Sequence, residues 1–305
     1  MTLRDTLIAI FVVFLWSTSL IVQKFAVNHI SIYVLGFLRL LSAGPLILIY
    51  RQPPRQLWRY LVAGFFWNVL NFLFIGFGFK SGIGAGISSF LIQTNVFFGV
   101  FFCYILLREN VHVTEIVGMF IASCGVYLLA QGGSHPLEES TMTGIISVLL
   151  SSVCWGVGFT LLKKMKIGAT MADNAWLSVI SAPVLLIIPF ILEGPQKAIF
   201  EFSHLNTIGF TCSLYVGFAS TICAGYLWLS LAQRVSSAQQ APFMLLLPIF
   251  TGVLSALFMQ EMLTLSQLFA GGIILIGVFV TRCSPILKRF RMQELLIKLK
   301  QNSYD

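Results

Sequence analysis

The chain alternates between long apolar stretches and short polar segments. Each stretch has about 20 residues, which is the length an α-helix needs to cross the roughly 30 Å hydrocarbon layer of a bilayer. The short alternating segments typical of membrane β-barrels are not seen. The pattern therefore predicts ten membrane-spanning helices, at 6–26, 31–50, 59–79, 83–107, 112–130, 142–164, 174–192, 206–231, 237–260 and 264–282.

The composition agrees with this pattern. Of the 305 residues, 57% are hydrophobic and 10% are charged, whereas soluble domains carry about 25% charged residues. The first apolar run is too long for a signal peptide. The six cysteines are scattered singly without a C-x-x-C motif, so we expect packing roles, no metal and no cofactor. The sequence predicts an all-α integral membrane protein.

The basic residues predict the orientation. All but four of the 19 lysines and arginines lie on the side of the N-terminus and the even-numbered connections. The exceptions are Lys24, Lys80 and Lys197 on the other side and Arg39 within a span. Because basic loops stay in the cytoplasm, we expect both termini there, in a multi-pass protein of a bacterial inner membrane. The net charge of +8 then reflects topology, and no nucleic-acid partner is expected.

The two halves of the chain are similar to each other. The first two spans align with the sixth and seventh at one constant shift in residue number. The fourth and fifth spans align with the ninth and tenth at a slightly larger shift, because the second half has an insertion near 193–206. The pairs of identical residues are Trp16 and Trp155, Lys24 and Lys163, Glu109 and Glu261, and Gly125 and Gly277. Five spans per half is an odd number, so the halves would have opposite orientations. We predict two inverted five-helix repeats, at 1–131 and 140–282, an architecture typical of secondary transporters.

The remaining segment, 283–305, is a basic tail that mixes cationic and apolar residues. It predicts either an interfacial helix on anionic lipid headgroups or a solvated cytoplasmic tail. Membrane lipids are expected partners in either case. The sequence is compatible with a monomer or a homodimer.

Several segments resemble one transporter family. They are LWSTSLIVQK (15–24), FLRL (37–40), SFLIQTNVFF (89–98), LLREN (106–110), CWGVGF (154–159), APFMLLLPIF (241–250) and QEMLTLSQ (260–267). Their order resembles the EamA-like branch of the drug/metabolite transporter superfamily, in particular bacterial exporters of amino acids and metabolites. The resemblance implies a basket of ten helices whose fifth and tenth spans are outer scaffolding. It also implies export of small metabolites.

The chain departs from internal symmetry at one place. Thr94 and Asn95 of the fourth span correspond to Leu246 and Leu247 in the second half. The polar lining of the cavity that the resemblance implies is therefore asymmetric.

Arg39 is the clearest charged residue inside a predicted span. It lies about 12 Å from the outer boundary at about 1.5 Å per residue, and its counterpart in the second half is Ser178. Intramembrane charge is expensive and usually functional. One interpretation is a clamp for a substrate carboxylate, which a guanidinium binds with two parallel hydrogen bonds. The alternative is a structural arginine that binds backbone carbonyls where helices cross.

Neutral amides form a second group of candidates. Asn68 and Asn71 lie in the third span, and Gln93 and Asn95 in the fourth. Amides within hydrocarbon must face protein or a wet cavity. We expect them to line a substrate cavity, and the alternative is hydrogen bonding between helices.

Aromatic residues form a third group. Trp16 and Trp155 are repeat-related and near the middle of their spans. We expect both to face one cavity as flat walls for an apolar or cationic group. Ordinary packing is the alternative. Tyr215 and Tyr226 in the eighth span are weaker candidates of the same kind.

The leading hypothesis is a secondary transporter that exports a small molecule, an amino acid or amino-acid derivative, by alternating access. The alternatives on the same fold are nucleotide-linked, lipid-linked or cationic drug-like cargo. An intramembrane enzyme is disfavoured, because no carboxylate or histidine lies in the middle of a predicted span and no H-E-x-x-H motif occurs.

Overall fold

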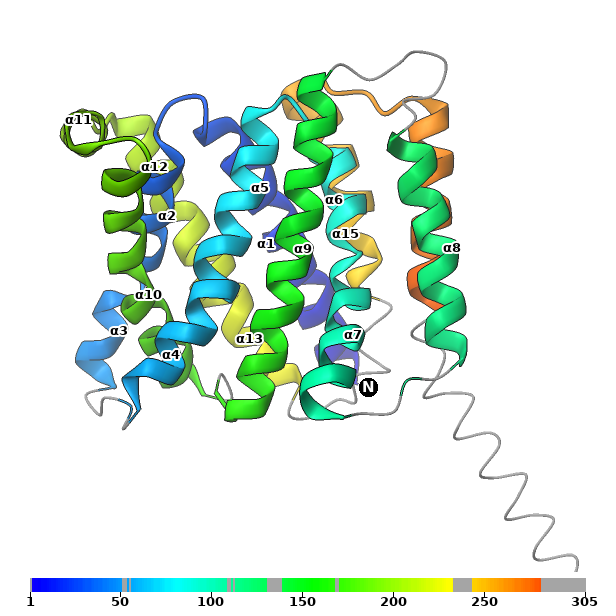
Figure 1. Ribbon diagram of the computed structural model, residues 1–305, viewed down its shortest axis with the longest axis horizontal. Coiled ribbons are helices and arrows are strands. Elements are labelled where there is room, and N and C mark those ends of the chain that lie inside the picture. Colours follow the sequence, from blue (N-terminus) through cyan, green and yellow to red (C-terminus); the bar gives the residue numbers. More distant parts are fainter. Residues whose placement is uncertain are drawn as a thin grey trace, which may run out of the picture.

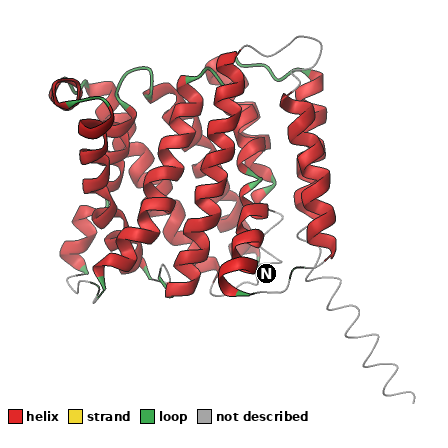
Figure 2. Ribbon diagram, viewed as in Figure 1, coloured by secondary structure: helices red, strands yellow, loops and turns green. Residues whose placement is uncertain are grey.

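The computed structural model describes residues 2–50, 54, 56–108, 111, 113–130, 139–167, 170–232 and 243–280. All regular secondary structure in these ranges is helical (Figure 2), which confirms the all-α fold class. The basic tail and Glu109 lie outside the described residues.

The first half begins with one continuous helix and continues with segmented ones. Its elements are α1 (Leu3–Ala26), α2 (Ile32–Leu41), α3 (Gly44–Ile49), α4 (Leu57–Gly64), the π-helix η1 (Phe65–Leu70), α5 (Asn71–Lys80), α6 (Ala85–Ile92), α7 (Asn95–Leu107) and α8 (Val113–Ala130). The third and fourth predicted spans are thus each made of consecutive segments.

The second half begins with two long continuous helices and also contains a π-helix. Its elements are α9 (Glu139–Met165), α10 (Met171–Leu192), α11 (Pro195–Ser203), α12 (Thr207–Val216), the π-helix η2 (Gly217–Ala224), α13 (Gly225–Ala232), α15 (Leu246–Met259) and a last helix, Leu265–Val280. Within the described residues, seven stretches are long and apolar enough to cross a membrane, and three shorter apolar helices accompany them. They fall on the expected spans, and ten crossings stays a prediction.

Local sequence determines several of the helix ends. α1 begins at a capping box, in which the Thr2 side chain accepts from the Asp5 backbone and the Asp5 side chain accepts from Thr2. Farther along the chain, α7 and α15 both finish in a left-handed residue, Arg108 and Gln260. These two residues occupy equivalent positions, because the same shift in numbering relates Glu109 to Glu261.

The helices stand side by side in a bundle, with α8 and the last helix together at one edge and α11 across one end (Figure 1). The edge pair approaches closely at two glycines. A Cβ on Gly125 would lie 2.8 Å from the Ala270 carbonyl, and one on Gly277 would lie 2.5 Å from the Gly118 carbonyl. Since Ala270 is the repeat equivalent of Gly118, the contact is reciprocal between the halves.

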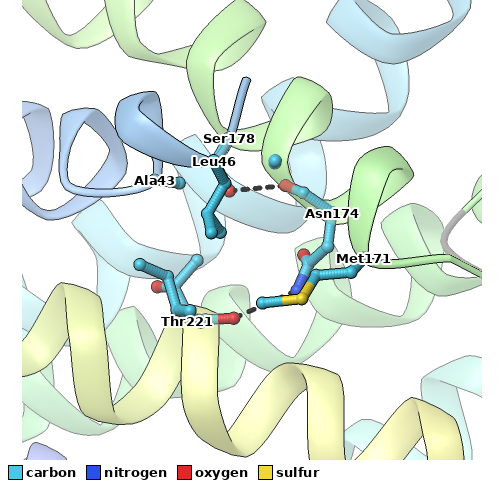
Figure 3. A pocket seen from close by; sticks show the side chains of 8 residues that line it. Ala43, Leu46, Met171, Asn174, Ser178 and Thr221 are labelled. Carbon is cyan, nitrogen blue, oxygen red and sulfur yellow. Dashed lines mark hydrogen bonds between the residues drawn. The ribbon is translucent and has the colours of Figure 1, made fainter. Parts of the chain in front are cut away.

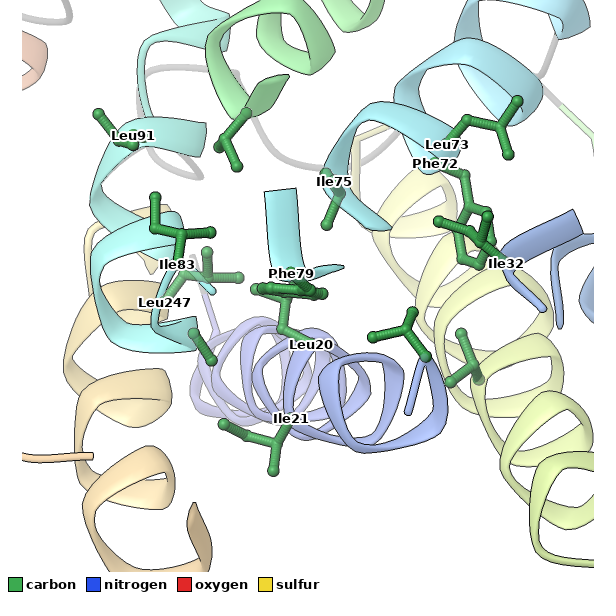
Figure 4. Close-up of a cluster of buried hydrophobic side chains, with 14 of the residues drawn as sticks. Leu20, Ile21, Ile32, Phe72, Leu73, Ile75, Phe79, Ile83, Leu91 and Leu247 are labelled. Carbon is green, nitrogen blue, oxygen red and sulfur yellow. The ribbon is translucent and has the colours of Figure 1, made fainter. Parts of the chain in front are cut away.

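The core runs through the centre of the bundle, where Leu20, Ile32, Phe72 and Phe79 are packed together (Figure 4). The outer surface is apolar instead of charged: Phe120, for example, exposes 72% of its surface. A water-facing surface could not carry so many exposed large apolar side chains, so this surface is suited to lipid.

Candidate functional site

Arg39 of α2 sits where the two halves meet. Its Nε donates to Thr221 Oγ1 of η2 at 3.0 Å, and its guanidinium carbon lies 4.6 Å from the centre of the Phe72 ring of α5. Within the described residues, Arg39 forms no ion pair with a carboxylate. The intramembrane cation therefore has a hydroxyl and an aromatic face as neighbours but no counter-charge.

Thr221, the residue that accepts from Arg39, also lines a small cavity (Figure 3). Its volume is about 10 Å³, close to the size of one water. Thr221 lines it together with Ser178, the repeat counterpart of Arg39. Asn174 Nδ2 donates to the Thr221 carbonyl at 3.0 Å, and Ser178 Oγ donates to the Asn174 carbonyl at 2.9 Å. The polar groups of α2, α10 and η2 thus converge around Thr221.

The four candidate amides differ in their hydrogen bonding. Asn71 Nδ2 donates to the backbone and hydroxyl oxygens of Ser151 at 3.2 and 3.1 Å, and Gln93 Nε2 donates to the Met244 carbonyl at 2.7 Å. Both side chains therefore join helices. Asn68 is 3% exposed and its Nδ2 has no partner within the described part of the chain. Asn95 is also buried. Asn68 is the amide that keeps an unused buried donor.

The two repeat-related tryptophans each pair with a tryptophan from the opposite half. Trp16 lies 5.4 Å from Trp228, and Trp155 lies 5.0 Å from Trp67, measured between ring centres. Trp155 also stacks on Phe159 at 5.2 Å. The structure thus brings the aromatic residues together as two clusters.

Tyr215 and Tyr226 lie closer to the periphery. Their exposed fractions are 39% and 43%. Tyr215 donates its hydroxyl to Thr18 Oγ1 at 2.8 Å. These positions differ from the buried amides, and their role in binding stays a prediction.

Two π-helices interrupt the bundle at equivalent places, and neither was predicted from the sequence. η1 carries Asn68 and η2 carries Thr221, and they begin at Phe65 and Gly217, which are equivalent positions of the two repeats. The wider turn of a π-helix changes the backbone pairing and is frequent at functional sites. In η2 two successive carbonyls accept side-chain bonds: Ser220 from Trp16 Nε1 at 3.4 Å and Thr221 from Asn174. No residue pattern in these segments predicts a π-helix.

Apolar helices of membrane-spanning length around an interior with a cation and amides are typical of a multi-pass membrane protein with a polar site inside it. The model of the EamA-like transporter family matches twice, at residues 5–131 and 142–283. The chain belongs to this family, which confirms the resemblance inferred from the motifs.

Similar proteins agree with this membership. A "probable amino-acid metabolite efflux pump" of Salmonella typhimurium is 26% identical over 285 residues, covering 92% of this chain and 95% of that protein. A protein of the same description from Escherichia coli is 26% identical over 286 residues, with the same coverage. An uncharacterized transporter of Archaeoglobus fulgidus is 26% identical over 275 residues, covering 87% of this chain and 94% of that protein.

A solved crystal structure shares the fold. It superimposes with a TM-score of 0.62 and 17% identity, covering 95% of this chain and 99% of that one.

Proposed function

We propose that the protein exports a small amino acid or amino-acid derivative by alternating access, with Arg39 as the group that binds the substrate carboxylate. The observation that carries this proposal is the environment of Arg39, which lies within a span and has no carboxylate partner in the described residues. A cation in that position is costly unless an anion or water compensates it. A carboxylate on the cargo would supply the missing charge, in the bidentate geometry that guanidinium favours.

The other candidate groups support a zwitterion with some apolar surface. Asn68 has a buried donor without a partner in the described part of the chain, and an unmade hydrogen bond there is unfavourable until a ligand or water accepts it. Trp16 and Trp155, with the tryptophans they contact, offer flat apolar walls. The relatives described as amino-acid metabolite efflux pumps favour the same substrate class.

The mechanism we propose depends on two inverted repeats, 1–131 and 140–282. Three features support it: the reciprocal contacts of Gly125 and Gly277, the matching left-handed ends of α7 and α15, and the two separate matches of the family model. Repeats of opposite orientation can exchange conformations, so that a central site opens to one side and then to the other. The N-terminal end of the bundle would face the cytoplasm.

Metabolite profiling tests the proposed substrate class. Cells that overproduce the protein should release more of one or several amino acids or derivatives into the medium than cells that carry the empty vector. Cells producing Arg39→Gln at the same membrane level are the matched control and should release no excess. Release only of compounds that lack an anionic group, or equal release by Arg39→Gln, would refute the carboxylate clamp.

A further inference from the structure

An ion pair ties the two halves together at one end of the bundle. Lys24 lies in the last turn of α1, and Glu261 follows α15 directly. Their side chains form a salt bridge and are 11% and 28% exposed. Lys24 Nζ also donates to the Ile83 carbonyl, in the turn between α5 and α6, at 2.9 Å.

The second carboxylate oxygen of Glu261 is also used. Oε2 accepts from the Ala85 backbone N–H at 3.0 Å and from Ser255 Oγ at 2.7 Å. The left-handed conformation of Gln260, with φ of 57°, directs the chain back over α15. The contacts of this one pair therefore join α1, the beginning of α6 and the end of α15.

We propose that Lys24 and Glu261, with Ile83, Ala85 and Ser255, form an outer latch that must open for cargo to leave. The proposal rests on the proposed function and on the predicted orientation, which places Lys24 and Glu261 at the external end. α1 belongs to the first half and α15 to the second, so the two halves cannot separate here while the ion pair is formed. Low exposure of both partners makes the pair sensitive to the loss of either charge.

A pocket lies against the Glu261 side of this latch. Its volume is about 330 Å³, and it is lined by Glu261 and Ser255 with Gly84, Gln260 and Gln267 among the other residues. Inward from the latch, the structure is closed by packed apolar side chains, including Leu20 and Phe79. The latch thus borders both a pocket and the packed interior, a position that suits a gate.

A second ion pair, predicted to lie at the same external end of the bundle, provides a matched control. Lys197 and Glu193 form an ion pair at 3.1 Å, but they are only four residues apart in the chain, and the lysine side chain is 58% exposed. Both residues belong to the second half of the chain, so this pair does not join the two halves. Glu193→Gln should therefore leave the outer end unchanged.

Thiol labelling from outside tests the latch without a known substrate. Ser88 of α6 is fully buried, one turn inward from Ala85, and its hydroxyl has no partner within the described chain, so Ser88→Cys is a conservative reporter. It is placed in a variant without the six native cysteines and exposed in intact cells to a membrane-impermeant maleimide. We expect Glu261→Gln and Lys24→Gln to raise the labelling rate about tenfold, because losing one partner of this partly buried ion pair leaves the other charge without its counter-charge, and a tenfold shift corresponds to about 1.4 kcal/mol.

The charge-reversed double variant, Lys24→Glu with Glu261→Lys, restores the ion pair but not the bonds to Ile83 and Ala85, so it should return the rate part of the way to that of the parent. A partial return shows that the single variants are not merely misfolded. Hydrogen exchange of the Ala85 amide in purified protein is a second reporter, which should accelerate in Glu261→Gln and not in Glu193→Gln. Unchanged labelling and unchanged exchange, or equal effects of Glu193→Gln, would overturn the latch. Because neither reporter uses cargo, failure of the latch is distinguishable from failure of the proposed substrate class.

Discussion

Replacing Arg39 by methionine separates a binding role from a structural one. Methionine is unbranched, uncharged and shorter than arginine, so it removes the hydrogen bond to Thr221 and the contact with the Phe72 ring while filling the space of the aliphatic part of the side chain. If Arg39 exists to bind cargo, the variant should lose transport and keep its stability. If Arg39 exists to join helices, both should fall together.

The expected change in stability follows from the observed contacts. Removing a charge from within a span relieves about 2.5–3.5 kcal/mol on insertion scales. The lost hydrogen bond contributes about 0.6–1.7 kcal/mol in membrane proteins, and the lost cation–π contact about 0.5–2 kcal/mol. These terms nearly cancel, so the unfolding free energy should stay within about 2 kcal/mol of the parent.

Transport should respond far more strongly. Removing one partner of a desolvated charge pair costs about 2–5 kcal/mol, so cargo affinity should fall about 30-fold or more. Arg39→Lys should recover little, because an ammonium lacks the planar fork. Thr221→Val is the matched control, since it removes the same hydrogen bond and keeps the cation.

The assay measures uptake of the identified cargo into inverted vesicles, with thermal unfolding of the same purified variants. Two results would refute the reasoning. One is an Arg39→Met protein whose loss of stability clearly exceeds the near-cancellation expected from these terms. The other is a Thr221→Val protein that loses as much transport as Arg39→Met.

Two further predictions concern the architecture. Reporter fusions at Glu138 and Ser203 should read external and fusions at Gln52, Lys166 and Asn302 cytoplasmic; an external C-terminus would contradict the inverted repeat. Gly277→Ala should lower the unfolding free energy by about 1–3 kcal/mol, because its Cβ would meet backbone atoms of α8, and Gly125→Ala should cost a similar amount. Gly272→Ala in the same helix has nothing within 4 Å of the new Cβ and should be tolerated, so equal losses at Gly272 and Gly277 in thermal unfolding would remove the close-contact argument.

The helices could be predicted from the sequence because a bilayer leaves few alternatives. Backbone groups within hydrocarbon must be paired inside the same segment, so an apolar run long enough to cross the bilayer becomes a helix whatever its neighbours are. The interruptions were not predictable in this way. The π-helices and the break between α6 and α7 depend on how side chains of neighbouring helices pair with the backbone, as Trp16 and Asn174 do with η2.

The candidate site was predictable in residue type but not in pairing. Arg39 and Asn68 were identified because polar groups are rare in these spans, and the described structure leaves both with unused capacity. The same reasoning selected Asn71 and Gln93, whose amides bind Ser151 and the Met244 carbonyl. Sequence alone cannot distinguish these cases, because an amide that joins two helices and an amide that binds a ligand both look like a polar residue within an apolar span.

The latch and the candidate binding groups are joined through η2 and α1. Arg39 binds Thr221 and Trp16 binds the carbonyl of the preceding residue, Ser220, so the candidate cation and one aromatic wall meet on consecutive residues of a π-helix. Lys24 follows Trp16 by about two turns on the same continuous helix, which is about 12 Å along its axis. A carboxylate that draws Arg39 away from Thr221 would disturb the segment that holds α1, and α1 carries one half of the latch. Arg39 on α2 and Lys24 on α1 are thus connected through the contacts that both helices make with η2, a route by which binding of cargo could reach the latch during alternating access.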